Sequence, residues 1–335
     1  MGQDTQAPPH RASKRKAWTY APETAPPFKD LFAGGERRKA AVKYWIKQNL
    51  ENANDIFMYF ALKLLPARAC SDFGANLARY ATPRWHKGAL RRATATLLAL
   101  RPEASDAELA QLLDAYADSQ GRQMSEYSVV ERLAHDKRRL RFEGTEGLAA
   151  ATADGPTIFI STHTANWEVM WCCLIDMGIK LTLNYAPPRQ RSRHWIVNRV
   201  RTGAGLDILK PGRSAVRPAL RLLEDGGNLL VFCDEGFNGQ IRGPFLGMEP
   251  HLSGNLGLVA RLARKTGARI CLVYIVRDGG TRFTLHAEAP FHLPEGDSSE
   301  ANLIEDVKLL NSKIEPIIRA YPEQWYFVDN ALPPR

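Results

Sequence analysis

The chain has 335 residues, and its 45 lysines and arginines outnumber its 36 aspartates and glutamates, which gives a net charge of +9. Hydrophobic residues make up 44% of the chain and charged residues 24%, values that are ordinary for folded proteins and argue against a disordered chain. The length suits one large domain or two modest ones. The excess of positive charge predicts an anionic partner, such as a membrane surface, a phosphorylated substrate, an acidic protein or nucleic acid.

The cysteines and the start of the chain bear on the compartment. The five cysteines contain no Cys-x-x-Cys pair and no metal-ligand spacing with histidine, so we expect buried free thiols in a reducing compartment, without disulfides or a metal site. The first residues include no apolar stretch of signal-peptide length, so secretion is not expected. No run of about 18 apolar residues occurs, and no transmembrane helix is therefore predicted.

The N-terminal third is predicted to be a tail followed by helices. Residues 1–36 are rich in Pro, Ala, Lys and Arg with little periodicity, which is typical of a flexible basic tail. Helical spacing then extends over residues 37–136, where Ser105 is placed to cap a helix that begins at residue 106. Residues 42–66 form its most apolar segment. Two interpretations of that segment stand, an amphipathic helix at a bilayer interface and a helix packed on the protein's own core.

From residue 137 onward the hydrophobic period alternates between that of strands and that of helices. Strands are predicted at 140–143, 157–160, 179–185, 206–209, 228–233, 269–276 and 281–288. Helices are predicted at 166–176, 190–202, 214–225, 252–265 and 300–319. Strands separated by helices predict an α/β domain over residues 137–330, with a mostly parallel central sheet flanked by helices.

The stretch Pro156–Met170 carries the clearest pattern for chemistry. A short β-branched strand leads to His163 in a polar loop, and Glu168 lies within the first turn of the helix that follows. A histidine that accepts a proton from a hydroxyl needs a carboxylate to fix its tautomer and to stabilise the imidazolium. The His-x4-Glu spacing therefore predicts a catalytic pair. The alternative is an ordinary hydrogen-bonded pair with a structural role.

Two further regions are candidates for binding. Residues 189–221 hold nine lysines and arginines and one acid, Asp207, a local charge of +8, which indicates either an anion site or a solvated basic face. Nucleic acid would suit this charge, but no recognition helix or aromatic platform accompanies it. The second region begins with Asp234, Glu235 and Gly236, which end a buried strand at the edge where open α/β sheets place their ligands.

Together these segments resemble the lysophospholipid acyltransferase superfamily, and within it the lipid A biosynthesis (lauroyl/myristoyl) acyltransferases. The likeness extends over residues 42–328 and rests on ordered blocks. These are His163-x4-Glu168 with Asn166-Trp167 inside it, Asn198-Arg199-Val200-Arg201, Asp234-Glu235-Gly236 followed by Pro244-Phe245-Leu246-Gly247, and Pro322-Glu323-Gln324 before an aromatic residue. The chain departs from the family pattern at Glu235, where glutamine is common, and at Leu272, where proline is usual. It also lacks the basic residues that follow the C-terminal aromatic block in many members. These departures leave the donor and the acceptor open.

The resemblance implies a bacterial acyltransferase at the cytoplasmic face of the inner membrane, with a membrane-associated N-terminal helical region. It implies transfer of a fatty acyl chain from acyl carrier protein or acyl-CoA to a lipid hydroxyl, with a lipid A precursor as the expected acceptor. His163 would be the general base and Glu168 its orienting acid. The resemblance also implies residues that bind substrate, either as donors to an acceptor phosphate or an oxyanion or through other contacts with the ligand. They are Asn166, Arg199, Arg201, Asp234, Gly236 and Arg242.

No cofactor, metal or nucleic acid is implied by the resemblance, and the basic cluster can also dock an acidic carrier protein. Two alternatives remain open. The first is the same chemistry on another acceptor, such as a lysophospholipid, a glycolipid or an aminolipid. The second is a catalytically silent peripheral protein that uses its basic face to bind an anionic membrane.

Overall fold

The computed structural model describes residues 23–210, 212–237 and 239–332. Residues 1–22 of the predicted tail lie outside this range. The described end of that tail contains a 3-10 helix, Phe28–Phe32, which packs against the first helices of the chain. The indole Nε1 of Trp45 donates a hydrogen bond of 2.9 Å to the carbonyl of Pro26, and the ring of Phe28 packs edge-on against the same indole.

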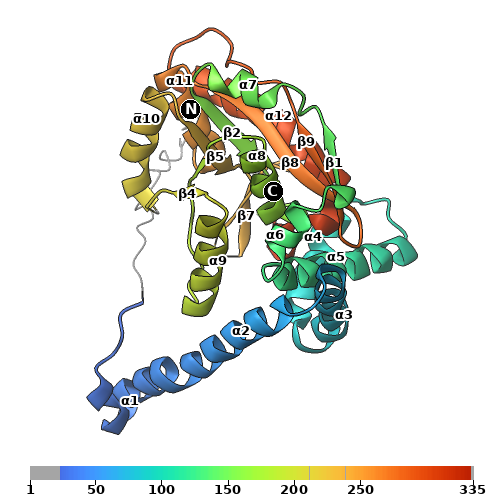
Figure 1. Ribbon diagram of the computed structural model, residues 1–335, viewed down its shortest axis with the longest axis vertical. Helices are drawn as coiled ribbons and strands as arrows, with labels where there is room; N and C mark the ends of the chain where they lie inside the picture. Colours follow the sequence, from blue (N-terminus) through green and yellow to red (C-terminus); the bar gives the residue numbers. More distant parts are fainter. Residues whose placement is uncertain (1–22, 211, 238, 333–335) are drawn as a thin grey trace, which may run out of the picture.

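The N-terminal region is helical, as predicted. It consists of α1 (Gly35–Val42), a π-helical turn (Lys43–Lys47), α2 (Gln48–Lys63), α3 (Ala67–Trp85), α4 (Lys87–Leu100), α5 (Asp106–Glu126) and α6 (Val130–Ala134). Figure 1 shows α1 and α2 as one long rod below the rest of the molecule. None of the helices in the described ranges is long and apolar enough to cross a membrane.

Helix α5 is anchored at its start and along its length. Ser105 caps it through a capping box with Glu108, which confirms the predicted cap. The helix continues to Glu126, and it packs closely on α3. A Cβ atom on Gly74 would lie 2.2 Å from the carbonyl oxygen of Gly121, so the two helix backbones approach at a distance that glycine alone permits.

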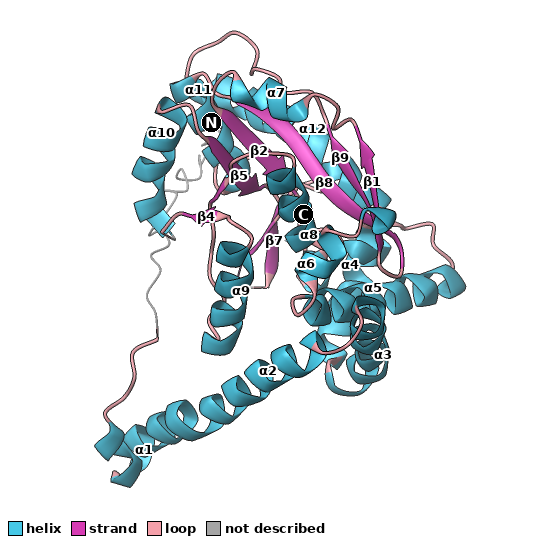
Figure 2. Ribbon diagram, in the orientation of Figure 1, coloured by secondary structure: helices cyan, strands magenta, loops and turns pink. Residues whose placement is uncertain are grey.

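A seven-stranded sheet forms the centre of the α/β region (Figure 2). Its strands are β1 (Leu140–Glu143), β2 (Thr157–Ser161), β3 (Thr182–Leu183), β4 (Asp207–Ile208), β5 (Asn228–Phe232), β8 (Arg269–Gly279) and β9 (Arg282–Ala287). The order is β1-β9-β8-β2-β5-β3-β4, and every neighbouring pair is parallel except β8 and β9. The predicted mostly parallel sheet is thus confirmed.

Helices cover both faces of this sheet, because side chains of a strand alternate between the two faces. Phe159 of β2 packs with α8 (Trp167–Asp176) and α9 (Arg191–Gly203). Its neighbours Ile158 and Ile160 pack on the other face with α10 (Val216–Glu224), α11 (Asn255–Thr266) and α12 (Glu300–Ala320). A short helix, α7 (Leu148–Ala153), precedes β2.

The structure differs from the sequence prediction mainly at the edge of the sheet and after β5. β3 and β4 contain two residues each, shorter than the predicted 179–185 and 206–209, and β4 is the last strand of the sheet. No strand is predicted for the glycine-rich segment after β5. It forms a hairpin of β6 (Glu235–Phe237) and β7 (Gln240–Gly243), whose turn includes Gly239 at φ +75°.

Candidate active site

His163 and Asp234 meet where two neighbouring parallel strands end. β2 and β5 are paired so that Ser161 lies opposite Phe232, and the amide of Cys233 still donates to the carbonyl of Ser161 at 2.9 Å. Two residues after each strand end, the chain presents His163 from β2 and Asp234 from β5. Parallel strands finish at the same edge of a sheet, and this edge is where α/β proteins bind ligands.

The carboxylate of Asp234 fixes both the loop and the ring of His163. One carboxylate oxygen accepts a hydrogen bond from the main-chain N–H of His163 at 2.7 Å, and the other lies 2.9 Å from Nδ1 of its ring. The indole Nε1 of Trp325 donates a third hydrogen bond to the same carboxylate at 2.7 Å. Because a carboxylate accepts hydrogen bonds, the imidazole proton lies on Nδ1, which leaves the lone pair on Nε2.

The ring of His163 is held among aromatic side chains. It stacks on Phe232 with the ring centroids 4.0 Å apart, and Trp167 and Phe327 pack edge-on at 4.9 and 5.2 Å. Nε2 of His163 makes no hydrogen bond to the residues that the structure describes, and 22% of the side chain remains exposed. This geometry presents an unprotonated nitrogen to a ligand, as a general base requires.

The C-terminal segment after α12 closes the site from another side. Thr164 pairs with Trp325 in an antiparallel bridge, and the amide of Tyr326 donates to the carbonyl of His163 at 2.9 Å. The amide of Ala165 donates to the carbonyl of Gln324 at 3.1 Å. The block Pro322-Glu323-Gln324 and the residues after it therefore contact the loop that carries the histidine, and Trp325 contacts Asp234 directly.

The expectation that the carboxylate of Glu168 faces the imidazole of His163 is wrong. Glu168 is fully buried and accepts two hydrogen bonds from the guanidinium of Arg201, from NH2 at 2.8 Å and from Nε at 3.2 Å. The hydroxyl of Tyr127 donates to it at 2.8 Å, and the indole of Trp167 at 3.1 Å. A first-turn side chain on α8 points along the helix surface into this cluster, whereas His163 turns toward β5.

This contact also changes the interpretation of Arg201. Its guanidinium is 5% exposed and lies over the rings of Trp171 and Tyr185, with 4.7 and 4.5 Å to the centroids. A buried arginine that neutralises a buried glutamate is not positioned to receive a phosphate. Burial and the Glu168 carboxylate together raise the pKa of the Tyr127 hydroxyl well above its ordinary value, so Tyr127 stays a hydrogen-bond donor.

Asn166 is likewise structural in its contacts. Its side-chain oxygen caps α8 by accepting hydrogen bonds from the amides of Glu168 and Val169. Its side-chain nitrogen donates to Glu126 at 2.7 Å, and Glu126 forms a bidentate ion pair with Arg277. Burial opposes ionisation of Glu126, but Arg277 and the hydrogen bonds hold its pKa below the ordinary value. Sequence reasoning missed Glu126 and Arg277, which are 151 residues apart.

The remaining predicted site residues have separate surroundings. A Cβ atom on Gly236 would lie 1.8 Å from the side-chain nitrogen of Asn330, so Gly236 packs tightly against the C-terminal segment. Glu235, next to Asp234, accepts the amide of Asn255 at 2.8 Å, and burial raises its pKa, while Arg242 acts in the opposite direction. Arg242 is therefore close enough to Glu235 to interact electrostatically.

The basic cluster predicted over residues 189–221 is divided by the fold. Arg191 lies over the ring of Tyr44, and Arg193 forms an ion pair of 3.7 Å with Asp55, so the start of α9 binds the N-terminal rod. Arg199 is exposed and lies over Trp195 of its own helix. Arg217 and Arg221 belong to α10, which lies apart from α9 in Figure 1.

The cysteines lie in the part of the chain that the structure describes, together with other possible metal ligands. All five cysteines are free and buried, and burial raises the pKa of the Cys70 thiol to about 11. Within the described ranges, no three or more His, Cys, Asp or Glu side chains are grouped so that they could hold a metal ion.

An imidazole that is oriented by a buried carboxylate, at the carboxyl edge of a parallel sheet, has the geometry that general-base catalysis on a hydroxyl requires. The sequence matches the family described as bacterial lipid A biosynthesis acyltransferase over residues 40–332. The chain therefore belongs to this family of acyltransferases, and it is an enzyme of that class. No curated protein matches the chain.

Proposed function

We propose that the chain transfers a fatty acyl group from the thioester of acyl carrier protein or acyl-CoA to a hydroxyl of a lipid A precursor, with His163 as the base. The observation that carries this proposal is the contact between Nδ1 of His163 and Asp234, which prepares Nε2 to accept a proton. The family match supports the acyl chemistry and the association with lipid A.

In the proposed reaction, Nε2 of His163 removes the proton of the acceptor hydroxyl while the oxygen attacks the carbonyl carbon of the thioester. A carbon–oxygen bond forms, and the carbonyl electrons move to oxygen to give a tetrahedral intermediate. When this intermediate collapses, the carbon–sulfur bond breaks, and the thiolate takes the proton from the imidazolium. Asp234 stabilises the imidazolium between the two steps without itself becoming protonated. The products are an ester and a free thiol.

The apolar face of the N-terminal rod supports a peripheral position on the inner membrane. Exposed apolar residues follow one another at steps of four, three, four, three and four residues, which places them on one face of a helix: Ile46, Leu50, Ala53, Phe57, Phe60 and Leu64. The buried residues Asn52, Tyr59 and Leu62 lie on the opposite side. With Lys43, Lys47 and Lys63 beside the stripe, this face suits an anionic bilayer surface.

The proposed activity is tested by incubating the full chain with acyl carrier protein or CoA thioesters and detergent-dispersed acceptors. The acceptors are a lipid A precursor, a lysophospholipid, a glycolipid and an aminolipid. We expect thiol release that depends on the acceptor, and an increase in mass of the lipid A precursor by one acyl group. Acylation of another acceptor in preference to the precursor would overturn the proposed substrate. Binding to anionic vesicles without any thioester consumption would favour the non-catalytic alternative.

The membrane face leads to a separate prediction. Leu50 and Phe57 are each 68% exposed, so replacing both by glutamine is expected to weaken partition into anionic vesicles by about tenfold or more, since burial of each side chain contributes roughly 1.5–3 kcal/mol. Vesicle sedimentation measures this change. Phe142→Gln, at an exposed phenylalanine of β1, is the control and should leave partition unchanged. Equal partition of the double variant and the wild type would contradict the assignment of this face.

A further inference from the structure

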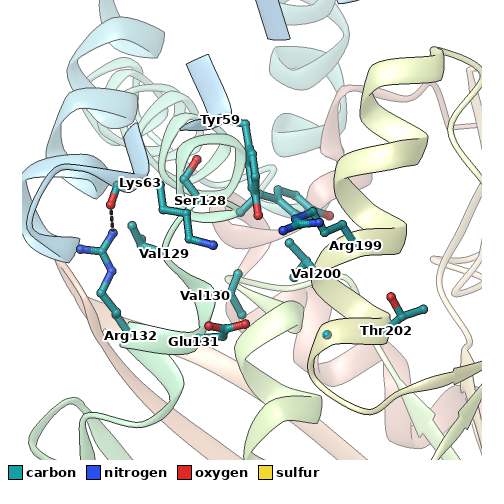
Figure 3. Close-up of a pocket in the computed structure, with 12 residues that line it drawn as sticks. Tyr59, Lys63, Ser128, Val129, Val130, Glu131, Arg132, Arg199, Val200 and Thr202 are labelled. Carbon is teal, nitrogen blue, oxygen red and sulfur yellow. Dashed lines mark hydrogen bonds between the residues drawn. The ribbon is translucent and has the colours of Figure 1, made fainter. Parts of the chain in front are cut away.

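A pocket of about 700 Å³ lies between α2, the segment 127–132 and α9 (Figure 3). Its lining includes Tyr59 and Lys63 of α2, and Arg199 and Val200 of α9. It includes neither His163 nor Asp234, so it is separate from the proposed site of proton transfer. Its volume lies in the range of pockets that bind small ligands or headgroups.

The lining of this pocket carries three cations, Lys63, Arg132 and Arg199, and one acid, Glu131, which gives a local charge of +2. Arg132 is fixed, since its guanidinium donates to the main-chain oxygens of Leu65 and Lys63 at 2.7 Å each. Figure 3 shows the amino group of Lys63 and the guanidinium of Arg199 directed into the space between the helices.

Lys63 and Arg199 have aromatic neighbours but no carboxylate partner in the part of the chain that the structure describes. The amino group of Lys63 lies 5.8 Å from the ring centroid of Tyr59, and the guanidinium of Arg199 lies 5.4 Å from that of Trp195. Neither group forms an ion pair with a carboxylate among the described residues. Two cations that line one pocket and form no ion pair with a described carboxylate favour the binding of an anion there.

The other lining residues indicate what carries the anion. Val129, Val130 and Val200 make part of the wall apolar, so the ligand is expected to be amphipathic. One wall is α2, and its pocket-lining Lys63 lies beside the exposed apolar stripe proposed to rest on the bilayer. An anion that reaches this pocket from that surface would be attached to a lipid.

The pocket is also close to the proposed catalytic residues. Tyr127 lines it, and the Tyr127 hydroxyl donates to Glu168 at 2.8 Å. The neighbouring Trp167 donates to the same carboxylate and packs edge-on against the ring of His163. A path of direct contacts through Tyr127, Glu168 and Trp167 thus connects the pocket with His163.

We propose that this pocket binds a phosphate monoester carried by a lipid at the membrane surface, through Lys63 and Arg199. The assignment of the ligand to a lipid rests on the proposed function, in which a lipid is the acceptor. The phosphate would hold the headgroup beside the catalytic site, and Tyr59 and the valines would contact its uncharged part. The proposal assigns a specific ligand group to Arg199, which the sequence predicted to bind substrate. It also adds Lys63, which the sequence did not indicate.

The test measures binding directly by calorimetry, so it needs no turnover. The probes are dihexanoyl phosphatidic acid, which is soluble and carries a phosphate monoester, dihexanoyl phosphatidylcholine, and inorganic phosphate. We expect phosphatidic acid to bind the wild type at least about tenfold more tightly than either other probe. The double variant Lys63→Gln/Arg199→Gln should weaken that binding by about tenfold or more, as expected for two charge-assisted contacts.

Two controls separate the pocket from a general effect of charge. Arg217→Gln/Arg221→Gln removes the same charge from α10 and should change binding by less than about twofold, while Lys63→Arg/Arg199→Lys keeps both charges and should retain most of it. Equal weakening by both glutamine pairs, or none by the pocket pair, would overturn the assignment. Inorganic phosphate that binds as tightly as phosphatidic acid would show a site for free phosphate. Binding as expected without any acyl transfer would contradict the proposed function and leave this site standing.

Discussion

Replacing His163 by glutamine is expected to lower the rate of acyl transfer by about 10²- to 10⁴-fold, the range observed for loss of a positioned general base. Glutamine can still donate a hydrogen bond to Asp234, but its amide cannot take a proton from a hydroxyl near neutral pH. The side chain is partly exposed, so the stability of the fold should change little. Single-turnover thiol release with a saturating acceptor measures the chemical step.

The control for this variant is His135→Gln, since His135 is another partly exposed histidine paired with an aspartate, Asp176, at 3.3 Å. It should retain the wild-type rate. Thermal unfolding of both variants checks that the fold is intact. Acyl transfer that survives in a folded His163→Gln variant would remove His163 from the role of base, although the family membership would be unaffected.

The sequence predicted the elements and the place of His163 in the loop after β2, because these depend on local pattern. A β-branched run gave β2, a polar loop placed His163 after it, and Asn166 marked the start of α8. The partner of His163 could not be obtained in this way. Asp234 is 71 residues away, and it lies beside His163 because β5 pairs with β2, an order of strands that hydrophobic periodicity does not specify.

Sequence spacing also suggested a partner that the fold uses elsewhere. Glu168 is five residues from His163, yet its carboxylate binds Arg201, which is 33 residues further on and reaches it from α9. The sequence did contain one usable signal. His163 and Asp234 each follow a buried strand by two residues, so both belong to the same edge of any parallel sheet that pairs those strands.

Replacing Asp234 and Glu168 one at a time is expected to distinguish a carboxylate that orients His163 from one that stabilises the fold. In Asp234→Asn, the amide oxygen is expected to occupy the position that accepts hydrogen bonds from the His163 main chain and from Trp325. The amide nitrogen would then face Nδ1 and donate to it, which places the imidazole proton on Nε2. Because the base is then in the wrong tautomer, acyl transfer should fall by about a thousandfold or more.

Glu168→Gln is expected to act on stability instead. It leaves the buried guanidinium of Arg201 without its counter-charge, which should lower the free energy of unfolding by about 3–5 kcal/mol. Acyl transfer per folded molecule should fall by less than about tenfold, since Glu168 reaches His163 through Trp167. In the double variant Glu168→Gln/Arg201→Met, which removes both buried charges, part of the lost stability should return.

Denaturant unfolding and single-turnover rates, measured on the same preparations, distinguish the two roles. If Asp234 orients the base, its asparagine variant combines a large loss of rate with a smaller loss of stability, and the glutamine variant of Glu168 shows the reverse. A folded Glu168→Gln variant as inactive as His163→Gln, beside an active Asp234→Asn variant, would restore Glu168 as the orienting acid. The contact of 2.9 Å between His163 and Asp234 would then not represent the arrangement in which the reaction occurs.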